Sequence, residues 1–217
     1  MKVLWLCNIM LPAIAETFGL PYSNREGWLT GIYEKLCKEN KEIELGICFP
    51  MTEIPEMIKE RCQTGVGFEL AETGTQCYPF TENLAMPEVY DASLEDSFKG
   101  ILEDFKPDMV HIFGTEFPHT LAMIRAYGKP EQTLVGIQGL CYACADAYMA
   151  DLPARVINRR TFRDILEKTV LWSNSRNSGC VGNGRRKLCW VSDILQAGQS
   201  LIREKRQQSM SKHSIIS

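Results

Sequence analysis

Long apolar runs are missing from this sequence of 217 residues, and none approaches the roughly 18 residues that a membrane-spanning helix needs. The apolar opening MKVLWLCNIMLPAIA has one lysine and contains Pro12, so we interpret it as a first core strand and not as a signal peptide. Secretion is therefore not indicated, and we expect a cytoplasmic protein. Hydrophobic residues make up 45% and charged residues 24%, a composition typical of a globular chain.

Phosphate-binding signatures are missing as well, since neither G-x-G-x-x-G nor a Walker A sequence occurs. Their absence argues against a nucleotide-dependent enzyme that is complete in one domain. Cys141 and Cys144 have the spacing of a redox motif or of half a zinc site, but no second C-x-x-C or His pair completes a zinc shell. Nine cysteines without a secretory signal indicate a reducing compartment, so we expect mostly buried thiols, no metal site and no cofactor.

Charge divides the chain near residue 169. Residues 1–168 hold 16 Lys and Arg against 25 Asp and Glu, whereas residues 169–217 hold 8 against 2 and lack apolar periodicity. We interpret 169–217 as an aberrant, Ser-rich basic tail, as a shifted reading frame would produce, and expect disorder apart from a short helix near 191–206. Basic tails are typical of proteins that bind nucleic acid or anionic membranes. We expect no nucleic-acid partner here and leave peripheral membrane contact open.

Residues 1–168 alternate between strand-like and helix-like segments. The expected strands are 2–9, 43–49, 109–113 and 133–137, with a hairpin or strand in 65–80. The expected helices are 26–40, 93–105, 119–127 and 156–168. Ser93 is the expected N-cap of the second helix, which Pro107 should end. This order predicts an α/β fold, a Rossmann-like doubly wound parallel sheet with helices on both faces.

Three loops follow the expected core strands and should meet at one rim of the sheet, where ligands bind in such folds. The loops are 12–28, 114–119 and 138–140. Their candidate ligand-binding residues are Gly27, Trp28, Gly114, Thr115, Glu116, His119, Gln138 and Gly139.

Each candidate also has a structural explanation. Gly27 and Trp28 could bring backbone N–H groups to a phosphate, or serve as a hinge and a core residue. Glu116 and His119 could hydrogen-bond sugar hydroxyls, although helix capping explains Thr115 and Glu116 about as well. We interpret His111, inside an apolar strand, as a core histidine. By contrast, turn chemistry does not require the amide of Gln138 at the rim.

Three segments resemble the N-terminal domain of family 4 glycosyltransferases: MKVLWLCN with its downstream GWL, KPDMVHIFGTEFPH, and LVGIQGL. The resemblance covers residues 1–168. It implies the GT-B fold, in which this half binds a glycan or lipid-linked acceptor and a second domain binds a nucleotide sugar. It further implies retaining transfer of a hexosyl group without a metal, in which the leaving diphosphate assists the acceptor.

The sequence departs from that family at Gln138-Gly139, where many relatives have His-Gly. Glutamine can hydrogen-bond a hydroxyl but cannot act as a general acid or base, so we name no catalytic residue. We expect a truncated glycosyltransferase half that lacks its donor domain and is inactive alone. The alternative is a non-catalytic Rossmann-like binding or interaction module with a basic tail, whose binding would be salt-sensitive and lost on deletion of 169–217.

Overall fold

The structure is a computed structural model that describes residues 1–23, 27–40, 42–62, 66–83 and 89–138, with 152–153, 155, 197–201 and 203. The strands are β1 (Lys2–Leu6), β2 (Glu44–Met51), β3 (Phe68–Leu70), β4 (Thr75–Thr81), β5 (Met109–Phe113) and β6 (Thr133–Gly136). The helices are α1 (Pro12–Thr17), α2 (Gly27–Glu39), α3 (Glu56–Arg61), α4 (Ser93–Phe105) and α5 (Pro118–Tyr127), with a 3₁₀ turn at Pro130–Gln132.

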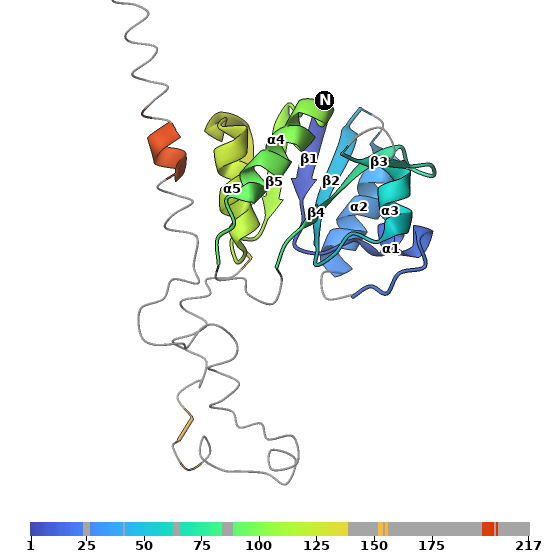
Figure 1. The fold of residues 1–217 in the computed structure, drawn as a ribbon, viewed down its shortest axis with the longest axis horizontal. Helices are drawn as coiled ribbons and strands as arrows, with labels where there is room; N and C mark the ends of the chain where they lie inside the picture. Colours follow the sequence, from blue (N-terminus) through green and yellow to red (C-terminus); the bar gives the residue numbers. More distant parts are fainter. Residues whose placement is uncertain are drawn as a thin grey trace, which may run out of the picture.

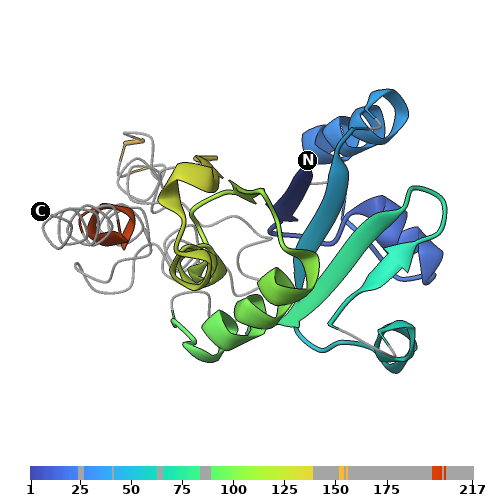
Figure 2. The same cartoon turned by 90° about the horizontal axis from the view of Figure 1, so that it is seen from above.

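One six-stranded sheet organises these elements in the order β3-β4-β2-β1-β5-β6 (Figure 1). The short strand β3 runs antiparallel to β4, and the other neighbouring strands are parallel. Helices cover both faces, with α2 and α4 on opposite sides (Figure 2). The fold is therefore the Rossmann-like α/β arrangement that the alternation of segments predicts.

Two hydrophobic cores lie on the two faces of the sheet, because alternate strand residues point to opposite sides. The first core packs α4 and α5 against residues such as Leu4, Val110 and Ile112. The second packs α1, α2 and α3 against the alternate residues, among them Trp5 and Ile47. Burial of both faces explains why the central strands are continuous apolar runs rather than alternating ones.

Helix α4 follows its expected limits, but its N-terminus is capped differently. Leu94, Phe98 and Ile101 recur at helical spacing and are buried in the first core. Ser93 is the first helical residue and not the N-cap, and Asp91 Oδ1 accepts its backbone N–H at 2.9 Å. The helix ends at Phe105, because Lys106 adopts a left-handed conformation (φ 54°) and Pro107 follows.

Three expected boundaries near the sheet are wrong. Strand β1 ends at Leu6, and the expected 12–28 loop contains helix α1, which begins at Pro12, a favoured first helical residue. Strand β2 runs through Pro50 instead of closing there. Since β1 pairs with β2 only as far as Cys48, the missing N–H of Pro50 costs no ladder bond to β1.

Strand β6 is the last strand of the sheet that the described residues form, and it is not the fully buried strand that its sequence predicts. Leu134 is 49% exposed, and Val135 is only partly buried. The apolar sequence led to the wrong expectation because burial depends on what covers the second face. In the described part of the chain, helices cover the β6 face that carries Val135 and leave the Leu134 face open.

Little of the region after residue 138 is described. Residues 197–201 are helical, in agreement with the short helix expected near 191–206, and Ala197 and Leu201 pack against the first core. The expected helix 156–168, the Cys141–Cys144 pair and the remainder of the basic tail lie outside the described residues. No helix among the described residues is both long enough and apolar enough to cross a bilayer.

Three of the five cysteines in the described part of the chain are buried, and Cys37 and Cys62 are partly buried. Cys7, Cys48 and Cys77 are buried free thiols within the sheet. Burial raises the pKa of Cys48 and of Cys77, which keeps both thiols protonated.

Gly46 permits the close contact of β2 with the first core, and its replacement tests that packing. A Cβ at Gly46 would lie 2.8 Å from Leu4 Cδ1 and 3.0 Å from Phe105 Cζ. We expect Gly46→Ala to lower the free energy of unfolding by about 1–3 kcal/mol through overpacking. Gly31→Ala, on the exposed side of α2 with nothing within 4 Å, is the control and should raise it by about 0.5–1 kcal/mol. Equal urea midpoints for the two variants would contradict this packing.

Candidate functional site

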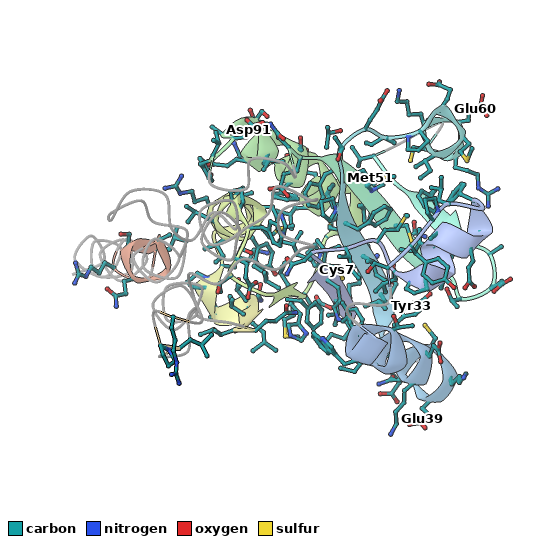
Figure 3. All side chains as sticks on the ribbon, turned by 90° about the horizontal axis from the view of Figure 1, so that it is seen from below. Cys7, Tyr33, Glu39, Met51, Glu60 and Asp91 are labelled. Atoms are coloured by element: carbon teal, nitrogen blue, oxygen red, sulfur yellow. The ribbon has the colours of Figure 1, made fainter. Side chains whose placement is uncertain are left out.

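The carboxyl edge of the sheet has a topological switch point between β1 and β5. The chain leaves β1 toward α1 on one face and leaves β5 toward α5 on the other. In open α/β sheets this divergence is where ligands bind. Figure 3 looks onto this edge and shows Cys7, which follows β1, over the middle of the sheet. The next residue is Asn8, and Gly114 directly follows β5.

A buried polar chain connects three segments at this edge. His119, the second residue of α5, is 0% exposed. Its Nδ1 lies 2.7 Å from Glu82 Oε2, just after β4, and its Nε2 lies 3.0 Å from Asn8 Oδ1. Both ring nitrogens therefore contact side chains from the segments that follow β4 and β1.

Two oxygen atoms at this edge are buried without a hydrogen-bond partner among the described residues. They are Glu82 Oε1 and Thr115 Oγ1. Unsatisfied buried oxygen atoms are costly, typically by about 1–3 kcal/mol each, and they gather at functional sites more than in ordinary cores. These two oxygen atoms belong to the loop after β5 and to the residue after β4.

Gly114 has no side chain, and this lets the side chains of Glu116 and Asn8 approach each other. Its φ is 99°, which L side chains rarely adopt. A Cβ here would lie 2.1 Å from Glu116 Oε2 and 2.6 Å from Asn8 Nδ2. These two side-chain atoms fill the space beside the glycine. Glu116 Oε2 also accepts the backbone N–H of Thr115 at 2.7 Å, and this fixes the carboxylate.

Aromatic rings form the adjoining wall on the α2 side. Phe113, the last residue of β5, lies 5.1 Å from Trp5 and 5.7 Å from Trp28 between ring centroids. Trp28 is 49% exposed at the start of α2. An indole offers a flat apolar surface and an N–H donor at its edge. This wall therefore ends in an accessible ring at the carboxyl edge.

His111 belongs to this wall and not to the polar chain. Its ring lies 4.0 Å from that of Phe113 and 6.4 Å from that of Trp5. Burial lowers the pKa of His111, so its ring is neutral at pH 7. The interpretation of His111 as a core residue agrees with these contacts, although the ring is only partly buried.

The structure brings several of the predicted site residues to one edge. Gly27 and Trp28 begin α2, and Gly114, Thr115 and Glu116 follow β5. Gln138 is exposed two residues after β6, whose Gly136 oxygen accepts the Gly114 N–H at 2.8 Å. Gly139 lies outside the described residues.

His119 differs most from the sequence expectation. It was expected to contact sugar hydroxyls, yet it is fully buried and both ring nitrogens are engaged. Capping of α5 by Thr115 or Glu116 does not occur either, because Phe117 is the N-cap and no side chain caps it. Glu116 instead supports its own loop.

Asn8 and Glu82 are site residues that sequence reasoning missed. Each is the first strongly polar residue after a core strand, in L-W-L-C-N and P-F-T-E respectively. Asn8 lies inside the expected strand 2–9, and Glu82 lies beyond the expected hairpin or strand in 65–80, so neither falls in one of the three expected rim loops.

The comparisons with known proteins identify no relative of this chain: no family model, no curated protein and no solved structure matches it. In the described part of the chain, no group of three His, Cys, Asp or Glu side chains is arranged to hold a metal ion.

Proposed function

We propose that the sheet domain is the acceptor-binding half of a retaining, GT-B-type glycosyltransferase that acts at the cytoplasmic side of the cell. The observation that carries the proposal is the meeting of Asn8, Gly114 and Glu116 at the switch point between β1 and β5. The sequence resemblance to family 4 glycosyltransferases supports it independently.

The groups at this edge suit a sugar acceptor. Glu116 can accept from a hydroxyl, and the Asn8 amide can hydrogen-bond a second oxygen. Trp28 offers a flat apolar surface for a sugar ring. We infer that these residues hold and orient a glycan or lipid-linked acceptor. The nucleotide-sugar donor would be held by a second domain, and no general base on this domain is needed if the donor's diphosphate takes up the acceptor proton.

The role of Trp28 can be tested by ligand binding. The full chain would be titrated calorimetrically with a panel of oligosaccharides and short-chain lipid-linked sugars. We expect at least one to bind, and Trp28→Ala to weaken it about tenfold, which is about 1.4 kcal/mol. Ile32→Ala is the matched control, because Ile32 is 46% exposed one turn further along α2. No binding across the panel, or equal losses for both variants, would contradict the proposal.

A second candidate is the non-catalytic interaction module with a basic tail, which the charge of residues 169–217 favours. It predicts salt-sensitive binding to anionic vesicles that disappears when 169–217 is deleted. The glycosyltransferase proposal instead predicts that this deletion leaves sugar binding unchanged.

A further inference from the structure

We propose that Glu82 and His119 are positioning residues that hold the Asn8 amide in one orientation, so that the end of β1 presents an N–H donor to an oxygen of the ligand. The inference rests on the proposed function only for the identity of that ligand.

The hydrogen-bond partners of His119 decide the orientation. A carboxylate oxygen can only accept, so Nδ1, at 2.7 Å from Glu82 Oε2, carries a proton. Asn8 Oδ1 can only accept as well, so Nε2, at 3.0 Å, carries a second proton. We infer from these two acceptors that the ring is doubly protonated and paired with the Glu82 carboxylate; both side chains are buried, at 0% and 4% exposure.

This pairing directs the other end of the Asn8 amide. With Oδ1 held by His119, Nδ2 lies 2.6 Å from the Cβ position of Gly114, beside Glu116 Oε2. An Asn8 donor and a Glu116 acceptor therefore flank the glycine at the switch point. A neutral His119 would accept from Nδ2 instead, and the amide would turn its oxygen toward the Glu116 carboxylate. The protonated ring thus selects a donor–acceptor pair over two acceptors.

A purely structural role explains this arrangement less well. A buried ion pair seldom stabilises a fold more than apolar residues of similar volume. Here the pair also leaves Glu82 Oε1 buried without a partner among the described residues, which is a further cost. His119 has no exposed surface, and Asn8, at 8% exposure, is the partner that lies beside Gly114 and Glu116, so we take Asn8 as the route by which the pair acts on a ligand.

The test is direct observation of the His119 protons. In long-range ¹H–¹⁵N spectra of the ¹⁵N-labelled full chain at pH 7, we expect both His119 ring nitrogens to be protonated. His119→Gln assigns the signals, and His111, a neutral ring, is the internal reference. In Glu82→Gln we expect a single ring proton and shifted Asn8 amide signals. A wild-type ring with an unprotonated Nε2 would overturn the proposal without the need for any variant.

Sugar affinity gives the second readout. For an oligosaccharide that binds the wild type, we expect Glu82→Gln to weaken binding about tenfold through the changed orientation of the Asn8 amide. Asn40→Asp, at the far end of α2, is the control and should leave affinity unchanged. Two ring protons with no sugar bound anywhere in the panel would refute the proposed function and leave the positioning role standing. Sugar binding that Glu82→Gln does not weaken would refute the positioning role alone.

Discussion

His119→Ala is expected to lower the free energy of unfolding by about 3–5 kcal/mol, measured by urea denaturation at pH 7. The substitution leaves the Glu82 carboxylate buried with no partner for either oxygen among the described residues, and an uncompensated buried charge costs this much. The ring also contributes stacking on Phe117 and an edge contact with Phe80. Few single substitutions outside the two hydrophobic cores should lower the free energy of unfolding as much.

The paired variant Glu82→Leu with His119→Phe separates charge from packing. Removing both charges leaves apolar side chains among Phe80 and Phe117, so we expect most of the lost stability to return. His111→Ala is the matched control, because that histidine has ring contacts but no carboxylate, and it should cost only about 1–2 kcal/mol. If the paired variant were as unstable as His119→Ala alone, the buried charge would not be the cause.

Gly114→Ala should damage stability and ligand binding together. Its φ of 99° is strained for alanine, and the new Cβ would collide with Glu116 Oε2 at 2.1 Å and Asn8 Nδ2 at 2.6 Å. We expect a loss of about 1–3 kcal/mol in unfolding free energy from strain. Because both site side chains must move, sugar affinity should fall by at least about tenfold, which is about 1.4 kcal/mol.

Gly128→Ala isolates the backbone part of this effect. Gly128 has φ 60° at the end of α5, and nothing lies within 4 Å of its Cβ position. Its replacement should cost about 1 kcal/mol and leave sugar binding unchanged. Equal sugar affinity of Gly114→Ala and Gly128→Ala would show that Asn8 and Glu116 do not contact the ligand.

The spacing of apolar residues predicted the elements that can be recognised from a short stretch of sequence, such as α4 and β5. Leu94, Phe98 and Ile101 repeat at the helical period, and this defines α4 whatever the helix packs against. The run from Met109 to Phe113 is apolar enough to be a strand between two covered layers, and β5 is that strand. The glycine at position 114 and the polar residues after it marked the edge that carries the candidate site.

The sequence alone determined the alternation of helices and strands, because the spacing of apolar residues is a local property. That alternation in turn predicts a parallel sheet, and it places Trp28, Glu116 and Gln138 at the carboxyl ends of its strands. Only the tertiary structure decided that β6 is partly exposed, that His119 is buried, and that Asn8 and Glu82 meet on its ring. The meeting on the His119 ring depends on contacts between residues 37 and 111 positions apart, and such distant pairings leave no periodic signal in a single chain.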